Sequence, residues 1–259
     1  AAVGTGFISF GLWVHHMYTT GLPALSLGFF SAASEAVAIP TGVQIFVFIA
    51  TMATGRVIFS VPMLFAAGAL AVFVFGGLTG VMVALAPFDW QAHDTHFVVA
   101  HLHYTLIGGM LLPLIAGLYY FFPFATKRML SARLGTWAFW LIFTGFNITF
   151  LPMHFTGLRG MPRRVFTYPA GHGWDWLNLI STFGAYIMAI GVLVVVVDVV
   201  RALRHGPGHG KEVTADIGSL TTEGQLRTVQ QHLEDALAKG ARIQAQSQPV
   251  GDVENGFFF

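Results

Sequence analysis

Apolar residues in this chain gather into six long segments that are separated by shorter polar stretches. Most segments have the roughly 17–25 residues that a helix needs to cross about 30 Å of hydrocarbon. Helices are required because lipid offers the backbone no hydrogen-bond partners. Residues 1–202 are therefore predicted to form an all-α, polytopic transmembrane helix bundle of about six spans. The predicted spans are residues 1–20, 36–56, 62–86, 97–122, 135–153 and 176–200.

Glycines and prolines predict local features of these spans. Gly76, Gly77 and Gly80 lie inside the third span, where small residues allow neighbouring backbones to approach closely. Prolines within or near the spans predict kinks at Pro40, Pro113 and Pro152.

From about Gly206 the chain becomes polar, with acidic and basic residues mixed. Residues 206–210 are rich in glycine and predict a linker, and the flanking His205 and His209 are expected to be solvated rather than bound to metal. Residues 225–239 predict an amphipathic helix. We expect residues 203–259 to form a partly disordered cytoplasmic tail without chemistry of its own.

Composition agrees with a membrane protein. Hydrophobic residues make up 55% of the 259 residues and charged residues only 10%, whereas a soluble domain carries about a quarter charged residues. The formal net charge of +1 gives no reason to expect nucleic-acid binding. The absence of cysteine excludes disulfides, thiolate ligation of haem and iron–sulfur clusters within these residues. Metal ligands must then be histidine, carboxylate, methionine or backbone oxygen.

Lysine and arginine predict the orientation of the spans. The basic residues that follow the second, fourth and sixth spans alternate onto one side, which we assign as cytoplasmic; they are Arg56, Lys127, Arg128, Arg133, Arg201 and Arg204. The chain opens without an initiator Met, inside an apolar run, and is expected to be a fragment of a larger membrane subunit.

Two histidines in the fourth span are the strongest sign of chemistry, because ionisable residues inside a span are rare and usually functional. His101 and His103 are two residues apart, which at about 100° per residue places their imidazoles roughly 200° apart on a helix. The two rings therefore cannot share one metal ion. Two large planar cofactors, one on each side of the helix, explain the spacing; the alternative is a pair of hydrogen-bonded interior histidines.

Further candidate ligands lie near the predicted outer face. His15 and His16 are adjacent, and at a helix end both can reach one ion of copper, iron or zinc. The alternative is two interfacial histidines at a membrane boundary. Asp94 either caps the fourth helix or binds Mg²⁺ or Mn²⁺ together with His93.

Three charged residues stand out by their position. Arg163 and Arg164 lie on the predicted outer face, against the positive-inside trend, and call for a local anion such as a haem propionate. The alternative is that they are ordinary loop cations. Glu35 lies in an apolar run, nine residues before Gln44 on the same predicted helix. It is either an interfacial residue or a proton carrier or metal ligand.

Four motifs together match a known family. They are Trp13-Val-His-His-Met-Tyr18, Ile39-Pro-Thr-Gly-Val43, His93-Asp-Thr-His-Phe-Val-Val-Ala-His-Leu-His103 and Gly160-Met-Pro-Arg-Arg164. In their order and approximate spacing, the chain resembles the C-terminal half of cytochrome c oxidase subunit I, a twelve-helix subunit of the haem–copper oxidase superfamily. The resemblance covers roughly residues 1–202 and leaves out the polar tail.

The resemblance implies ligand roles for the histidines. His15 and His16 are similar to two of the three histidines that hold the active-site copper. His101 is similar to the axial ligand of the high-spin haem, and His103 to one axial ligand of the low-spin haem. The family's third copper histidine and second low-spin ligand belong to the N-terminal half of the subunit, which precedes the half that this chain resembles.

The resemblance also implies roles for charged residues and for partners. His93 and Asp94 are similar to ligands of a Mg²⁺ or Mn²⁺ site that subunit II completes, and Arg163 and Arg164 to a pair that binds haem propionates. The implied cofactors are two haems, expected to be a-type, with copper and Mg²⁺ or Mn²⁺. The implied partners are subunit II, subunit III, cytochrome c and the lipid of a bacterial plasma membrane.

As a function, the resemblance implies reduction of O₂ to water with electrons from cytochrome c, coupled to proton uptake or pumping. One residue departs from the family: Gln44 replaces the lysine of a proton path, although Thr41 of that path is retained. Glutamine does not titrate near neutral pH, so Glu35 is a candidate for another route. Nitric oxide reductases of the superfamily also lack the lysine, which makes NO the alternative substrate. A non-catalytic transporter or structural subunit would require every histidine to be incidental.

Overall fold

The computed structural model describes residues 1–126, 128–205 and 223–242. By its contacts the chain divides into two compact units, residues 1–45 with 59–208 and residues 46–58 with 209–259, and each is described by itself. The described residues are helical apart from turns and connections, with one isolated β-bridge between Thr95 and Pro162. This confirms the predicted all-α class.

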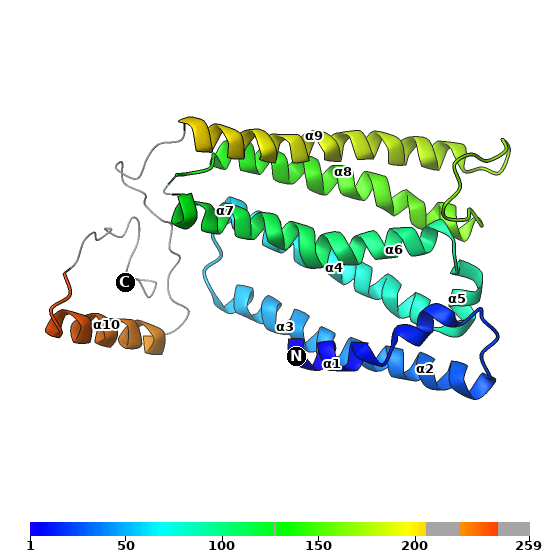
Figure 1. Cartoon of the computed structure of the whole chain (residues 1–259), viewed down its shortest axis with the longest axis horizontal. Coiled ribbons are helices and arrows are strands. Elements are labelled where there is room, and N and C mark those ends of the chain that lie inside the picture. Colours follow the sequence, from blue (N-terminus) through cyan, green and yellow to red (C-terminus); the bar gives the residue numbers. More distant parts are fainter. Residues whose placement is uncertain (127, 206–222, 243–259) are drawn as a thin grey trace. The chain divides into compact units, whose positions relative to one another are not determined.

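The helical elements follow the predicted apolar segments (Figure 1). Among them η1 is a 3₁₀ helix and η2 is a π-helical stretch between two α-helices. In chain order the described elements are α1 (Ala2–Phe10), η1 (Trp13–Met17), α2 (Ala24–Ala36), α3 (Ala38–Thr54), α4 (Val61–Ala84), α5 (Ala86–Ala92), α6 (His96–Leu106), η2 (Ile107–Leu111), α7 (Leu112–Thr126), α8 (Ala132–Leu158), α9 (Asp175–His205) and α10 (Glu223–Ala238).

Five helical stretches in the described part are long and apolar enough to cross a membrane, which makes the chain a multi-pass integral membrane protein. The last four predicted spans each overlap one of them. The stretches are Ala24–Thr54, Val61–Ala84, His96–Thr126, Ala132–Leu158 and Asp175–Arg204.

The first predicted span differs from the structure. Within residues 1–20 the helix α1 ends at Phe10, and Gly11 separates it from the short η1. Tertiary hydrogen bonds fix the following turn: the hydroxyl of buried Tyr18 donates to the carbonyl of Ala84, at 3.0 Å. These residues therefore form no span by themselves, and the described part of the chain has five candidate spans where six are predicted.

The second predicted span starts earlier than expected and is interrupted. Its helix begins at Ala24, and the break between α2 and α3 falls at Val37. Pro40 lacks the N–H that would bond the carbonyl of Ala36, so the predicted kink is confirmed here. Glu35 and Gln44 consequently lie in different helices, and the prediction that they share one helix is wrong.

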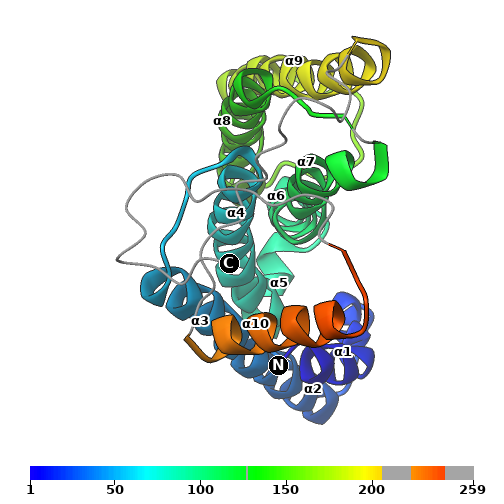
Figure 2. The same ribbon diagram turned by 90° about the vertical axis from the view of Figure 1, so that its left-hand side faces the viewer.

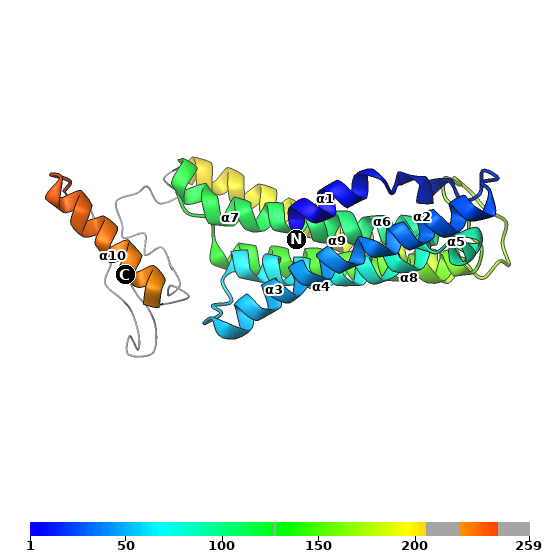
Figure 3. The same cartoon turned by 90° about the horizontal axis from the view of Figure 1, so that it is seen from below.

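The spans from α4 onward run along one common direction and connect antiparallel to one another (Figures 1 and 3). Seen along that direction, α4 and α6–α7 lie beside α8, and α9 packs on α8 (Figure 2). Aromatic rings fill the centre: Phe65 meets Phe139 edge-on at 5.3 Å, and Tyr104 meets Phe146 at 4.8 Å between ring centroids. Because lipid is as apolar as these side chains, close packing stabilises the arrangement.

Glycine allows α4 to approach α6 closely, as the sequence predicts. A Cβ atom on Gly76 would lie 2.9 Å from backbone atoms of Tyr104 and Thr105, so only glycine fits there. A Cβ on Gly77, by contrast, would meet nothing within 4 Å. The π-helical stretch η2 follows α6 and ends just before the first turn of α7, which contains Pro113. The sequence predicts a kink at this proline.

The two ends of α8 and α9 are joined by polar contacts. At one end Asp198 of α9 is fully buried and accepts hydrogen bonds from the backbone N–H of Ser131, at 3.0 Å, and the hydroxyl of Tyr119, at 3.2 Å. The Arg128 guanidinium donates to the carbonyl of Ala202, at 3.1 Å, near the end of α9. The other end carries the connection of residues 159–174. The axial register of α8 on α9 is thus fixed by polar groups as well as by packing.

In the second unit, α10 covers the range in which the pattern predicts an amphipathic helix. Gly240 ends it with a φ of 90°, and the N–H of Ala241 bonds back to the carbonyl of Ala236, at 3.0 Å. The predicted linker at residues 206–210, its flanking histidines' side chains and the remainder of the predicted tail lie outside the described residues.

Candidate functional site

His101 is held by the neighbouring helix α4. Its Nδ1 lies 3.0 Å from the carbonyl oxygen of Gly76 and 3.1 Å from Oγ1 of Thr79. Because a carbonyl oxygen only accepts, Nδ1 must carry the proton, and the lone pair of a neutral ring is then on Nε2. Gly80 leaves room for the ring, since a Cβ there would come 3.0 Å from Cε1 of His101. No pattern in the sequence indicates this role of Thr79.

His103 is held by its own helix. Its Nδ1 donates to the carbonyl of Val99, at 2.7 Å, and its ring stacks on Phe150 of α8 with centroids 4.2 Å apart. Its Nε2 therefore also carries a free lone pair. His101 contacts α4 and His103 contacts α8, so the predicted opposite-face geometry is confirmed.

His15 and His16 converge on one point. In η1 their Nε2 atoms lie 3.0 Å apart, and Nδ1 of His15 lies 3.1 Å from Oγ of the buried Ser34. Two nitrogens bound at about 2.0 Å to one ion lie roughly 2.8–3.3 Å apart for angles between 90° and tetrahedral. The adjacent pair can therefore bind a single metal ion, as the sequence predicts for a distorted helix end.

The electrostatic surroundings keep this pair neutral. Burial, with smaller contributions from His16 and His101, lowers the pKa of His15 to about 4. Burial also lowers the pKa of His16, although Asp89 acts in the opposite direction. Neutral imidazole is the form that binds metal.

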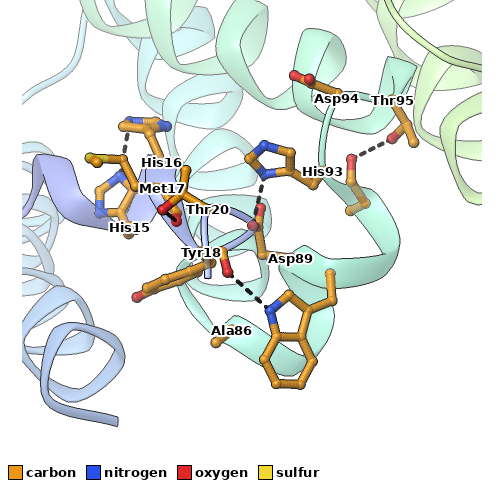
Figure 4. A network of polar contacts seen from close by, with 12 residues as sticks. His15, His16, Met17, Tyr18, Thr20, Ala86, Asp89, His93, Asp94 and Thr95 are labelled. Carbon is orange, nitrogen blue, oxygen red and sulfur yellow. Dashed lines mark hydrogen bonds and ion pairs between the residues drawn. The ribbon is translucent and has the colours of Figure 1, made fainter. Parts of the chain in front are cut away.

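His93 is oriented by Asp89, a carboxylate that the sequence-based predictions missed. Nδ1 of His93 lies 2.9 Å from Oδ2 of Asp89, which is buried in α5 beside η1 (Figure 4). Burial raises the pKa of Asp89, and the hydrogen bond from His93 opposes that shift. The spacing of four residues on one helix was the signal available in the sequence. A carboxylate behind a histidine is the usual outer partner of a metal-binding imidazole.

Asp94 lies beside His93 but does not cap the helix. The N-cap of α6 is Thr95, whose side chain accepts from the N–H of Phe97. Asp94 has a positive φ of 55° and forms an ion pair with Arg163. The cap interpretation of Asp94 is therefore wrong. Within the described residues, no three histidine, aspartate or glutamate side chains form a complete metal site.

Arg163 and Arg164 differ in their surroundings. The Arg163 guanidinium pairs with the Asp94 carboxylate, which supplies part of the anion that the position of this arginine calls for. The backbone N–H of Arg163 also donates to the carbonyl of Asp94, at 2.8 Å. Arg164 is exposed and has a positive φ of 64°. A non-glycine residue in this region is uncommon and often marks a functional segment.

Most of the chain matches a known protein family. The family model of "Cytochrome C and Quinol oxidase polypeptide I" matches residues 1–187. The chain belongs to the haem–copper oxidase subunit I family. Its relatives include "Probable quinol oxidase subunit 1" of Staphylococcus haemolyticus (strain JCSC1435), 44% identical over 216 residues. The equivalent protein of Staphylococcus aureus (strain USA300) is 45% identical over 216 residues.

The chain spans about a third of the length of these relatives: each alignment covers 83% of this chain and 32% of the relative. Among solved structures, one described as a "heme-copper terminal oxidase dimer" superimposes with a TM-score of 0.67 at 19% identity. That match covers 76% of this chain and 40% of the other, and at this identity it supports the fold alone.

The residues present fit the cofactors that the haem–copper oxidase family implies. Three of the histidines use Nδ1 for a neighbouring oxygen and so can direct Nε2 at a bound group: His101, His103 and His15. The rings of His101 and His103 contact different helices, α4 and α8, which suits two haems rather than one. The Nε2 atoms of His15 and His16 face each other, which suits a single copper ion.

The remaining predicted residues are not brought into contact with these histidines. The Thr41 hydroxyl donates to the carbonyl of Val37, at 2.9 Å, within its own helical stretch. Oε1 of Glu35 is shielded from solvent without a hydrogen-bond partner in the described part of the chain. Its neighbour Ser34 does contact His15, so Glu35 lies one residue from the support of the η1 pair.

His154 is a further histidine that the sequence-based predictions did not single out. It is 5% exposed in α8, and its two ring nitrogens have no hydrogen-bond partner among the described residues. Its ring meets Phe97 at 5.0 Å and Tyr104 at 5.4 Å between centroids. An isolated histidine in an apolar helix carries no periodic signal, so only the tertiary structure reveals its burial.

Proposed function

We propose that the chain is the C-terminal part of the catalytic subunit of a respiratory haem–copper oxidase, which reduces O₂ to water. The chief support is the pair of α6 histidines: His101 is bonded to α4 and His103 stacks on α8, and each uses Nδ1 for a carbonyl oxygen and leaves Nε2 free. The η1 pair adds two nitrogens that lie 3.0 Å apart. A transporter or structural subunit gives no reason for four ligand nitrogens in this arrangement.

In this proposal His101 holds the high-spin haem, His103 holds the low-spin haem, and His15 with His16 holds copper. When bound, the haems and the copper supply the electron transfer and the oxygen chemistry. The protein supplies their orientation. A third copper ligand and a second low-spin ligand come from the part of the subunit that precedes these residues.

Neighbouring carbonyl groups keep His101 and His103 in one tautomer. The carbonyl of Gly76, with the Thr79 hydroxyl, takes the Nδ1 proton on the α4 side of α6, and the carbonyl of Val99 takes it on the α8 side. Ser34 meets Nδ1 in η1. Such outer partners fix the ring and raise the basicity of the ligand nitrogen.

We further propose that His93 and Asp94, with a carboxylate of subunit II, bind Mg²⁺ or Mn²⁺. The hydrogen bond to Asp89 leaves Nε2 of His93 free for such an ion. Arg163 and Arg164 are proposed to bind haem propionates. Arg164 is exposed and forms no ion pair within the described residues, so its guanidinium can form the two-pronged contact that carboxylates favour.

The electron donor is proposed to be cytochrome c acting through subunit II, with subunit III as a further partner. The named relatives are quinol oxidases, which favours a quinol as the alternative donor. The two donors are distinguished by assaying the intact complex with reduced cytochrome c and, separately, with a soluble quinol.

The same intact complex is used to identify the electron acceptor. Turnover is measured with O₂ or NO as the only acceptor, and haem and copper contents are determined beforehand. We expect rapid O₂ consumption and much slower reduction of NO. NO reduction is the second candidate function because Gln44 replaces the family's proton-path lysine. Faster reduction of NO than of O₂, or an intact complex without haem, would overturn the first proposal.

Glu35 is proposed to take part in the altered proton route or in metal binding. Its carboxylate, of which Oε1 is buried without a hydrogen-bond partner among the described residues, lies in a membrane-spanning stretch, where such a group is seldom without function. We expect Glu35→Gln to lower O₂ turnover by about tenfold or more, equivalent to about 1.4 kcal/mol in the barrier. Gln44→Ala is the control and should cost far less. Normal turnover in Glu35→Gln would make the residue interfacial.

A further inference from the structure

The segment that carries Arg163 and Arg164 is tied to the start of α6 through its backbone. The N–H of His96 donates to the carbonyl of Met161, at 3.0 Å, and the N–H of Arg163 donates to the carbonyl of Asp94, at 2.8 Å. An isolated β-bridge between Thr95 and Pro162 lies between these two bonds. The two arginines therefore follow a short piece of paired backbone rather than a free loop.

A single amide side chain reaches both sides of this segment. Nδ2 of Asn178, in the first turns of α9, donates to the Tyr168 hydroxyl at 2.9 Å and lies 3.3 Å from Sδ of Met161. An amide nitrogen has two protons, so both contacts can be made together. Met161 is 3% exposed, and Tyr168 packs edge-on against Trp174 at 5.6 Å between ring centroids. Asn178 thus links Met161, two residues before Arg163, to Tyr168, four residues after Arg164.

The backbone between those two contacts is in a conformation that needs support. Arg164 has a φ of 64°, which a side chain other than glycine seldom adopts. Such a conformation persists only when the surrounding structure holds it in place. The contacts of Asn178 at Met161 and Tyr168 bracket this residue on either side. A helix-borne donor is well suited to the task because α9 is a long, continuous element.

We infer that Asn178 is a positioning residue that holds the Arg163–Arg164 segment in the conformation in which its guanidinium groups meet a carboxylate of the bound cofactor. The inference rests on the proposed role of the two arginines. Asn178 itself touches Met161 and Tyr168 and acts on the arginines through the backbone. A polar residue that merely begins a helix would have no effect on a cofactor at the arginines.

The test uses the intact, cofactor-loaded complex with Asn178→Leu, which keeps the approximate size and removes both donors. Two properties are measured: hydrogen exchange of the backbone amides in residues 159–174, and the midpoint potentials of the two haems. We expect exchange to become roughly tenfold faster, as for the loss of one or two hydrogen bonds. We expect one haem potential to shift in the same direction as in Arg164→Gln, by a smaller amount, at unchanged haem content.

Two further variants separate the effect of the Asn178 hydrogen bonds from that of any change in the first turns of α9. Thr182→Val removes an exposed hydroxyl one turn further along α9, which donates to the carbonyl of Asn178 within the helix, and should change neither property. Tyr168→Phe keeps the ring on Trp174 and removes one acceptor of Asn178, so a partial change in the same direction is expected. If the complex with Asn178→Leu does not assemble, Tyr168→Phe tests the inference in its place.

The outcomes distinguish this inference from the function on which it rests. If Arg164→Gln shifts a haem potential and Asn178→Leu does not, the positioning role is overturned and the role of the arginines stands. Faster exchange alone, without a shift, likewise reduces Asn178 to a structural residue. If Arg164→Gln leaves both potentials unchanged, the proposed propionate site fails, and the inference about Asn178 fails with it.

Discussion

The two faces of α6 hold their histidines by different means. On the α4 face, His101 is bonded across the helix interface to the carbonyl of Gly76, 25 positions away in sequence. On the α8 face, His103 is bonded to Val99 of its own helix and leans on the ring of Phe150. Both arrangements place the proton on Nδ1 and leave Nε2 free.

Different interactions can therefore disturb the two ligands. The tautomer of His103 is set by a bond inside one helix turn, so it persists as long as α6 is helical. The orientation of His101 depends on how closely α4 approaches α6, and that approach requires the absence of a side chain at Gly76. Changes in α4 should therefore act on the high-spin haem, and changes in α8 on the low-spin haem.

The largest effect is expected from the ligands themselves. His101→Ala in the full subunit should abolish the high-spin haem signal and leave the low-spin band, whereas His103→Ala should do the reverse. The physical reason is that the two rings lie on different sides of α6, one bonded to α4 and the other stacked on α8. Optical spectra of the reduced and CO-bound complex report the two haems separately. Loss of only the low-spin band in His101→Ala would contradict the assignment.

The second largest effect is expected at the α4–α6 contact. Gly76→Ala places a methyl group against the backbone of Tyr104 and Thr105, which should cost about 1–3 kcal/mol of stability and displace the carbonyl that holds His101. Thermal unfolding and high-spin haem content are measured together. Gly77→Ala is the matched control, because its new methyl group meets nothing within 4 Å and should be tolerated. Equal effects of the two variants would show that the close contact of α4 with α6 does not depend on Gly76 in particular.

A smaller effect is expected on the other face. Phe150→Leu removes the ring that stacks on His103, at 4.2 Å between centroids, while the hydrogen bond to Val99 remains. We expect a loss of about 1 kcal/mol in stability, with a modest shift in the low-spin haem potential. A redox titration of both haems is the measurement. A larger shift of the high-spin haem would show that α8 does not act on His103 selectively.

The smallest effect is expected from Thr79→Val. The hydroxyl is one of two oxygens near Nδ1 of His101, and the carbonyl of Gly76 remains after its removal. We expect less than about 1 kcal/mol in stability and a small change in the iron–histidine stretching frequency, read by resonance Raman spectroscopy. Loss of the high-spin haem in this variant would mean that the hydroxyl, rather than the carbonyl, holds the ring.

Much of the site could be predicted because its geometry is local. The spacing of His101 and His103 determines their opposite faces on any helix, and the adjacency of His15 and His16 brings their rings within reach at a helix end. The pairing of Asp89 with His93 was equally local and was overlooked. The prediction of a first span was wrong because apolar composition does not indicate that the helix ends at Phe10. Tertiary contacts, such as that of Tyr18 with Ala84, fix the chain after this point.

Local patterns in the amino-acid sequence were enough to predict the later membrane spans, the opposite faces of the two α6 histidines and the family of the chain. The packing of the helices was needed to show that Gly76 accepts from His101, that Asp94 pairs with Arg163 rather than capping α6, and that Asp198 is buried among polar partners. The physical reason is distance along the chain. Periodicity fixes the direction of a side chain on its own helix, but the partner it meets depends on how separate helices pack and align, which no local pattern records.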